Sequence, residues 1–215
     1  MRQIIFPNWL VWVDKNLKWL SIPKLPLILT LIQVLGFLLV MRKPAFQTQL
    51  ILDPSAIFQG EIWRIFTFIA IPLMNHVLVF FVLWFFYSVM VGLEKAWGST
   101  LLTLYFLVAW LSAILISIVF GIPIKTFSYI GFSFFFALAT VVPNKEIHLF
   151  FILPIAFKWT AILMAAIFLI VPLLLASYEQ LRYLILSFVN YLLFFGKDYW
   201  LLLKKELEKR KRRSV

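Results

Sequence analysis

The stretch AWGSTLLTLYFLVAWLSAILISIVFGIPI, residues 96–124, runs from end to end without a Lys, Arg, Asp or Glu side chain. A helix needs about 20 apolar residues to cross the hydrocarbon core of a bilayer. Because lipid offers no hydrogen-bond partners to the backbone, a run of this kind is expected to be helical. The stretch therefore predicts a membrane-spanning helix from about Leu101 to Phe120.

Six other uncharged runs accompany this one, and 64% of the 215 residues are hydrophobic while only 13% are charged. Such a composition suits lipid rather than water. The 147–157 run is too short to span, and we interpret it as an interfacial loop. The pattern predicts an all-α polytopic membrane protein with six transmembrane helices. They are expected at 25–41, 76–93, 101–120, 128–142, 159–175 and 182–195.

The formal charge of +11 is concentrated at the two ends of the chain. The positive-inside rule places basic segments in the cytoplasm, so both termini are expected there, as an even number of crossings requires. We divide the chain into an amphipathic interfacial segment (1–24), a membrane domain (25–196) and a basic cytoplasmic tail (197–215). Contact with anionic lipid headgroups explains the basic ends, so membrane lipids and no nucleic acid are the expected partners.

A mixed loop, residues 42–64, separates the first two predicted crossings and lies outside the cytoplasm by alternation. We expect this outer loop to sit in the membrane interface. It ends in the sequence Gly60-Glu61-Ile62-Trp63-Arg64. In isolation, Trp63 is interpreted as an interface anchor and Arg64 with Glu61 as a solvated loop pair.

Several landmarks, taken in order, resemble the rhomboid family of intramembrane serine proteases across roughly residues 25–196. The resemblance implies the family's six-helix bundle, with a G-x-S nucleophile motif on the fourth helix. The matching positions are Trp63 and Arg64 in a WR segment, His76 at the start of the second helix, Gly92, Glu94 and Gly98 around the next turn, Gly131 and Ser133 in the G-x-S motif, and Leu153-Pro154-Ile155 with Lys158-Trp159 before the fifth helix.

Catalysis in that family uses the serine of helix four and a histidine of helix six, because a serine hydroxyl needs a base to take its proton. Ser133 is accordingly the candidate remnant nucleophile. No histidine follows His148 in this chain, and Phe134 replaces the glycine expected after the serine. His148 is expected at least 15 Å from Ser133, so His76 is the remaining candidate as a base or as an oxyanion helper.

Each of these residues also has a purely structural interpretation. Ser133 suits a small polar position at a helix interface. The run Phe134–Phe136 is interpreted as lipid-facing or core packing. Asn190, within the sixth predicted helix, is interpreted as a buried hydrogen-bonding site, because polar groups are costly at that depth. We expect no metal site and no cofactor, since two histidines and nine scattered carboxylates form no ligand motif.

We therefore expect a rhomboid-like protein without effective protease activity, which binds or routes the transmembrane segments of client proteins. Two alternatives remain open from the sequence. One is an active intramembrane serine protease that uses Ser133, and the other is a small membrane transporter. The compact form without added domains suggests a bacterial inner membrane.

Overall fold

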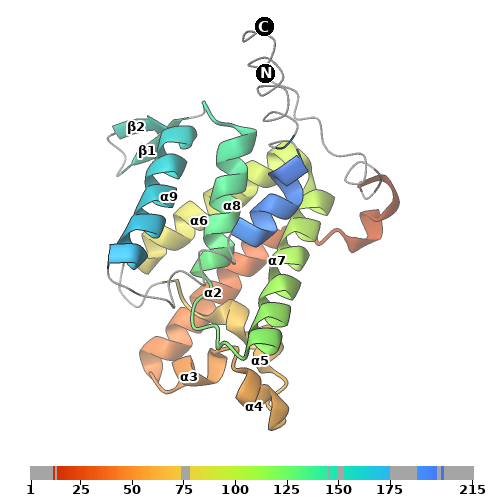
Figure 1. Ribbon diagram of the computed structural model, residues 1–215, viewed down its shortest axis with the longest axis vertical. Helices are drawn as coiled ribbons and strands as arrows, with labels where there is room; N and C mark the ends of the chain where they lie inside the picture. The colour runs from red at the N-terminus through yellow and green to blue at the C-terminus, as the bar shows by residue number, and fades with distance from the viewer. Residues whose placement is uncertain are drawn as a thin grey trace, which may run out of the picture.

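The described residues of the computed structural model, 12, 14–73, 78–144, 146–149, 153–174, 188–197 and 200, form a helical bundle with one short hairpin (Figure 1). The predicted helical architecture is confirmed. Three helical segments are long and apolar enough to cross a membrane, as expected of a helical membrane protein. They are Lys18–Arg42, Val79–Trp97 and Ser99–Phe120, and the shorter apolar helices Ser128–Val141 and Phe157–Ile167 accompany them.

The first of these segments consists of the 3-10 turn η1 (Lys18–Leu20) and the helix α2 (Leu25–Arg42). Lys24 takes a left-handed conformation, with φ of 59°, immediately before α2, and Pro26 occupies the first turn. Proline is favoured there because the first helical N–H groups have no partner within the helix. The bounds of α2 confirm the helix predicted at 25–41.

From here on, the outer loop means residues 42–70, because the structure continues past the predicted end at residue 64. This segment contains regular structure that the sequence did not predict. It forms α3 (Phe46–Leu50), α4 (Pro54–Phe58), α5 (Arg64–Thr67) and the 3-10 turn η2 (Phe68–Ala70), which gather at one end of the bundle (Figure 1). The Asp53 side chain caps α4 by accepting a 3.0 Å hydrogen bond from the Ser55 backbone N–H.

The outer loop is seated on α2 through a very close approach. A Cβ atom at Gly36 would lie 1.7 Å from the Ala70 carbonyl oxygen, which no side chain tolerates. The buried Gln33 side chain, one turn earlier, donates a hydrogen bond from Nε2 to the Ile69 carbonyl oxygen. The missing side chain at Gly36 and the hydrogen bond from Gln33 together hold η2 close to α2.

Helix α6 (Val79–Trp97) leads through Gly98 directly into α7 (Ser99–Phe120). The sequence places Glu94 in the connecting turn, and this prediction is wrong, because Glu94 and the Lys95 that follows it belong to the last turn of α6. The helix stops only at Gly98, whose φ of +84° is accessible to glycine at little cost. Ser99 Oγ donates a 2.7 Å hydrogen bond to Glu94 Oε1 across this junction.

Helix α8 (Ser128–Val141) lies at the centre of the bundle and packs against α6, α7 and α9 (Phe157–Leu174). The three phenylalanines Phe134–Phe136 are all buried, so the core interpretation of this run is confirmed. A central helix surrounded by others has no lipid-facing side. Its apolar residues therefore serve packing.

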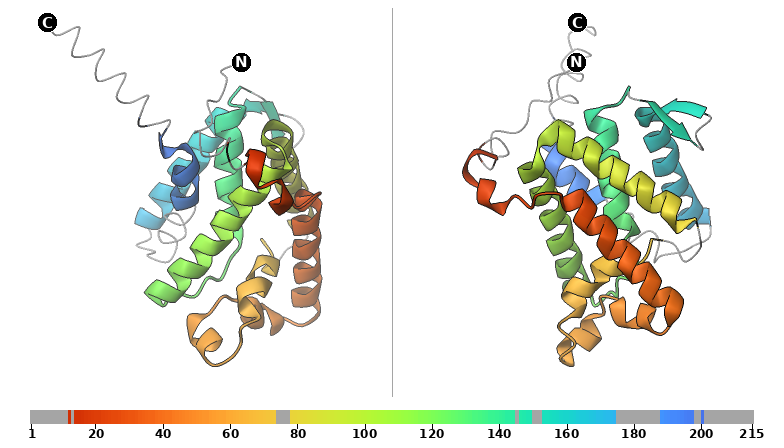
Figure 2. Two further views of the ribbon diagram at one scale, coloured as in Figure 1. Left: turned by 90° about the vertical axis from the view of Figure 1, so that its right-hand side faces the viewer. Right: turned by 180° about the vertical axis from the view of Figure 1, so that it is seen from behind.

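The predicted interfacial loop after α8 contains an antiparallel hairpin of β1 (Glu146–Leu149) and β2 (Leu153–Ala156), with Glu146 opposite Ala156. The hairpin and the outer-loop helices lie at opposite ends of the molecule in both views that face its broad side (Figures 1 and 2). A last helix, 188–197, packs against the bundle beside α7 and α8.

The connection between α7 and α8 is tied to the outer loop by a two-residue antiparallel bridge. Leu52 N–H donates to the Ile124 carbonyl oxygen at 3.2 Å, and Ile124 N–H donates to the Leu52 carbonyl oxygen at 2.9 Å. Both side chains are fully buried. One end of the molecule is therefore closed by backbone pairing between segments far apart in the sequence.

Candidate functional site

Ser133 lies within α8 and is only 1% exposed. Its Oγ atom is 2.5 Å from the hydroxyl oxygen of Tyr105, a fully buried residue of α7. The same tyrosine hydroxyl donates a 2.9 Å hydrogen bond to the backbone carbonyl oxygen of Ser133. The serine is thus held by a phenol from the neighbouring helix.

Asn190 reaches the same serine from the helix 188–197. Its Nδ2 atom donates a 3.0 Å hydrogen bond to Ser133 Oγ, and its side chain is buried. This confirms the interpretation of Asn190 as a buried hydrogen-bonding site. We refer to Ser133, Tyr105 and Asn190 together as the serine cluster.

The helix 188–197 packs directly on α8, which the sequence alone did not establish. The Tyr191 hydroxyl is 2.6 Å from Thr140 Oγ1. The rings of Phe136 and Phe188 stack with their centroids 5.4 Å apart. These contacts require no glycine at the interface, because large aromatic side chains interdigitate there.

The hydrogens of the serine cluster can be assigned from the donors and acceptors available. Asn190 Nδ2 can only donate, so Ser133 Oγ accepts from it. The single tyrosine proton is used toward the Ser133 carbonyl oxygen, which leaves the serine proton to be donated to the tyrosine oxygen. Every proton of the serine and tyrosine hydroxyls is therefore already engaged.

Neither neighbour of the serine hydroxyl is suited to act as a general base. A carboxamide nitrogen has no lone pair available for a proton, and a neutral phenol that keeps its own proton cannot take a second. Activation of a serine nucleophile requires a base within hydrogen-bond reach. The described contacts of Ser133 Oγ provide hydrogen bonding without proton transfer.

Aromatic rings enclose the serine cluster. The Tyr105 ring lies 4.7 Å from that of Phe194 and 5.3 Å from that of Phe134, measured between centroids. Phe134 also contacts Phe86 of α6, at 6.1 Å. Phe134 thus packs between α7 and α6, and it does not obstruct the hydrogen bond between Ser133 and Asn190.

The two histidines are placed as follows. His76, the candidate base or oxyanion helper, lies outside the described residues. The backbone of His148 belongs to β1, which follows the end of α8. From Ser133 to the last residue of α8, Val141, the helix rises about 12 Å. The expected separation of at least 15 Å between His148 and Ser133 stays a prediction.

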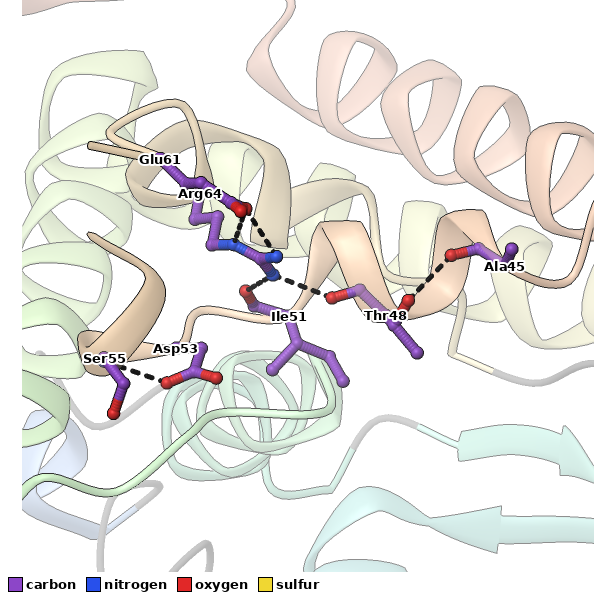
Figure 3. A network of polar contacts seen from close by, with 7 residues as sticks. All are labelled: Ala45, Thr48, Ile51, Asp53, Ser55, Glu61 and Arg64. Atoms are coloured by element: carbon purple, nitrogen blue, oxygen red, sulfur yellow. Dashed lines mark hydrogen bonds and ion pairs between the residues drawn. The ribbon is translucent and has the colours of Figure 1, made fainter. Parts of the chain in front are cut away.

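Arg64, from the WR segment, is buried, and its interpretation as part of a solvated pair is wrong in this respect. The guanidinium group lies 2.6 Å from Glu61 Oε2, so the pairing itself is confirmed. It also donates to the carbonyl oxygens of Thr48 at 2.7 Å and Ile51 at 2.9 Å (Figure 3). Arg64 thereby joins α3, α5 and the segment between them. Trp63 next to it is 53% exposed, as expected of an interface anchor.

The remaining motif positions serve packing and turns. A Cβ atom at Gly92 would lie 3.1 Å from the Leu138 side chain, so this glycine brings α6 close to α8. A Cβ atom at Gly131 would be 3.7 Å from Phe86, an ordinary contact distance. Within the described ranges, the acidic and histidine side chains nowhere gather in groups of three that could hold a metal ion.

Tyr105 is the residue of this site that sequence reasoning missed. It is one of six hydroxyl-bearing residues in the uncharged run 96–124, and nothing in its immediate sequence distinguishes it. The available signal was the cost of an unsatisfied hydroxyl at membrane depth, which implies a partner without naming it.

Comparison with family models, with curated proteins and with solved structures finds no match to this chain. The function is therefore inferred from the geometry of the serine cluster and from the order of the sequence motifs.

Proposed function

We propose that this chain is a rhomboid-like membrane protein with six transmembrane crossings, which binds transmembrane segments of other proteins without cleaving them. In this proposal both termini are cytoplasmic, and the outer loop lies on the opposite side of a bacterial inner membrane. Ser133 is the remnant of a nucleophile that has lost its base.

The observation that carries the proposal is the hydrogen bond from Asn190 Nδ2 to Ser133 Oγ, at 3.0 Å. By resemblance, rhomboid proteases bring a histidine from the sixth helix to the serine of the fourth. Here the last described helix brings a carboxamide to the serine of α8. A hydrogen-bond donor that cannot take a proton preserves the contact between the helices and removes the general base.

The outer loop gives independent support. The resemblance rests partly on the WR segment, and Arg64 of that segment is buried in a network that organises the loop (Figure 3). Arg64 connects several parts of the outer loop, so this residue has a structural role in the loop. An ordered loop around Arg64 therefore supports the proposal of a domain that keeps its fold although the serine lacks a base among its described contacts.

Client binding is assigned to the flank formed by α6 and α9, which both pack against α8. Trp84 of α6 and Ile162 of α9 are 51% and 60% exposed. In a membrane, helices associate through close packing and hydrogen bonds rather than through a hydrophobic driving force. We propose that a client helix packs along this flank.

The proteolytic part of the proposal is tested by two measurements on the reconstituted protein. We expect no cleavage of a transmembrane reporter and no labelling of Ser133 by a fluorophosphonate probe. An active rhomboid protease serves as the positive control for both assays, and the variant of that protease with its catalytic serine replaced by alanine serves as the negative control. Robust labelling that disappears in Ser133→Ala would instead establish an active serine hydrolase.

The binding part is tested by photo-crosslinking in native membranes. A photoreactive amino acid at Trp84 or Ile162 should give discrete adducts with membrane proteins. The same amino acid at Leu115 of α7, which is 61% exposed, provides the control. Equal adducts from all three positions, or solute flux through protein reconstituted without any client, would contradict the proposal and favour a different function.

A further inference from the structure

The segment that precedes α2 lies on the flank of the bundle beside α7 (Figures 1 and 2). We call residues 14–24, together with Trp12, the N-terminal arm. Two large aromatic side chains of the arm are strongly exposed, Trp12 at 60% and Trp19 at 77%. Exposed tryptophans on a membrane protein favour the headgroup level, where the indole ring is partly solvated and partly apolar.

Basic side chains occupy the same arm. Lys15, Lys18 and Lys24 are all exposed, and Asp14 is the acidic residue of this segment. The nearby acidic group at this end of α6, Glu94, already accepts a hydrogen bond from Ser99. The arm therefore presents a positive surface alongside its tryptophans.

The arm is attached to the bundle near the start of α7. The Ile22 backbone N–H donates a 3.1 Å hydrogen bond to Thr103 Oγ1 of α7, and Thr103 is fully buried. The turn η1 packs against α7. Leu25, which follows the left-handed Lys24, is 2% exposed and starts α2 within the core. The arm is thus held where α2 begins, and for a helix that spans a bilayer its end lies near the headgroup layer.

We propose that the N-terminal arm docks on an anionic phospholipid leaflet, with Lys15, Lys18 and Lys24 facing lipid phosphates and Trp12 and Trp19 inserted at the headgroup level. Basic residues near an anionic leaflet are attracted electrostatically, and tryptophans add an apolar contact. The inference requires that the spanning helices lie in a membrane. It is independent of the proposed likeness to rhomboids and of client binding.

The test exploits the absence of cysteine from the chain. A single Asn16→Cys substitution on the arm is labelled with a bimane fluorophore. The full-length protein is placed in nanodiscs of phosphatidylcholine alone or with 30% phosphatidylglycerol, doped with a headgroup nitroxide quencher. We expect stronger quenching in the anionic discs, with the difference reduced by salt because exposed charges are screened beyond about 10 Å at 0.1 M.

Replacement of the lysines by glutamine should weaken docking on anionic discs by on the order of fivefold for each lysine removed. Trp19→Ala should reduce quenching in both kinds of disc. Lys43→Gln, at the opposite end of α2, is the matched control and should change nothing. Hydrogen exchange of residues 14–20 in the unlabelled protein provides a second readout.

Two results would overturn the proposal. Equal quenching in neutral and anionic discs would make the arm a lipid-neutral anchor. Absence of quenching in both would place it in water, available to a soluble partner. Neither result bears on cleavage, labelling of Ser133 or client crosslinking, so the two proposals fail separately.

Discussion

Two networks of described residues bury polar side chains, and they do so in different ways. The outer loop closes around a charged group, with Arg64 bonded to Glu61 and to two backbone carbonyl oxygens (Figure 3). The bundle interior closes around three neutral groups, Ser133, Tyr105 and Asn190. The charged network lies at one end of the molecule and the neutral one lies within the bundle.

The difference reflects the cost of desolvation. An ion pair loses hydration energy when it is buried, and the loss is reduced when one partner keeps contact with water. The Glu61 side chain is 36% exposed and can do so, whereas every member of the serine cluster is at most 1% exposed. Neutral groups that bond to one another are therefore the less costly solution inside the bundle. Four experiments test this contrast.

The largest effect is expected for Arg64→Ala. It leaves two carbonyl oxygens and the partly exposed Glu61 carboxylate without their donor, and a buried acceptor left unsatisfied costs about 1–3 kcal/mol. Reversible unfolding by SDS in mixed micelles measures the loss, and limited proteolysis should show cleavage within residues 43–70. Lys43→Ala, an exposed basic residue near the same loop, is the control. An Arg64→Ala protein as stable as this control would show that the charged network contributes little.

Asn190→Asp should cost about 2.5 kcal/mol, because it puts a carboxyl group where the bundle supplies no compensating charge. Asn190→Leu is the matched comparison and should change stability by less than about 1 kcal/mol. The Oδ1 atom of Asn190 has no partner among the described residues, so the leucine removes an unsatisfied group along with a hydrogen bond. Equal effects of the two variants in the same unfolding assay would contradict the depth argument.

Gly36→Ala tests how the charged region is seated on the neutral one. The added Cβ would meet the Ala70 carbonyl oxygen at 1.7 Å, so the outer loop must shift, at an expected cost of about 2 kcal/mol. Gly131→Ala is the matched control, since its Cβ would meet Phe86 at an ordinary 3.7 Å. Hydrogen exchange should increase in residues 68–71 of the first variant alone. Similar thermal unfolding of both variants would show that the approach of η2 to α2 is adaptable.

The smallest effect is the coupling between Tyr105 and Ser133. A double-mutant cycle of Tyr105→Phe and Ser133→Ala should give an interaction energy of about 0.6 to 1.7 kcal/mol, the range for hydrogen bonds between helices in membranes. Ser88→Ala provides a control, because the hydrogen bond that this serine makes among the described residues lies within its own helix, to the Trp84 carbonyl oxygen at 2.8 Å. No measurable coupling would mean that the hydroxyl contact merely fills space.

Much of the helical layout could be predicted from the sequence. The predicted 25–41 and 101–120 helices correspond to Leu25–Arg42 and Ser99–Phe120. The predicted end of α6 failed because charged residues do not by themselves stop a helix, and Glu94 finds a hydrogen-bond donor in Ser99. The hairpin after α8 was missed because apolar runs of that length carry no distinct strand signal.

The apolar runs by themselves determined that this chain forms helices suited to lipid, because no other regular structure satisfies an isolated backbone there. Only the tertiary structure decided what Ser133 contacts. Tyr105 and Asn190 are 28 and 57 residues away from it along the chain. It also decided that Arg64 is buried. The carbonyl oxygens that accept from Arg64 come together only when the loop is folded. Helix formation is local, whereas hydrogen-bond partners between segments are fixed by how those segments pack.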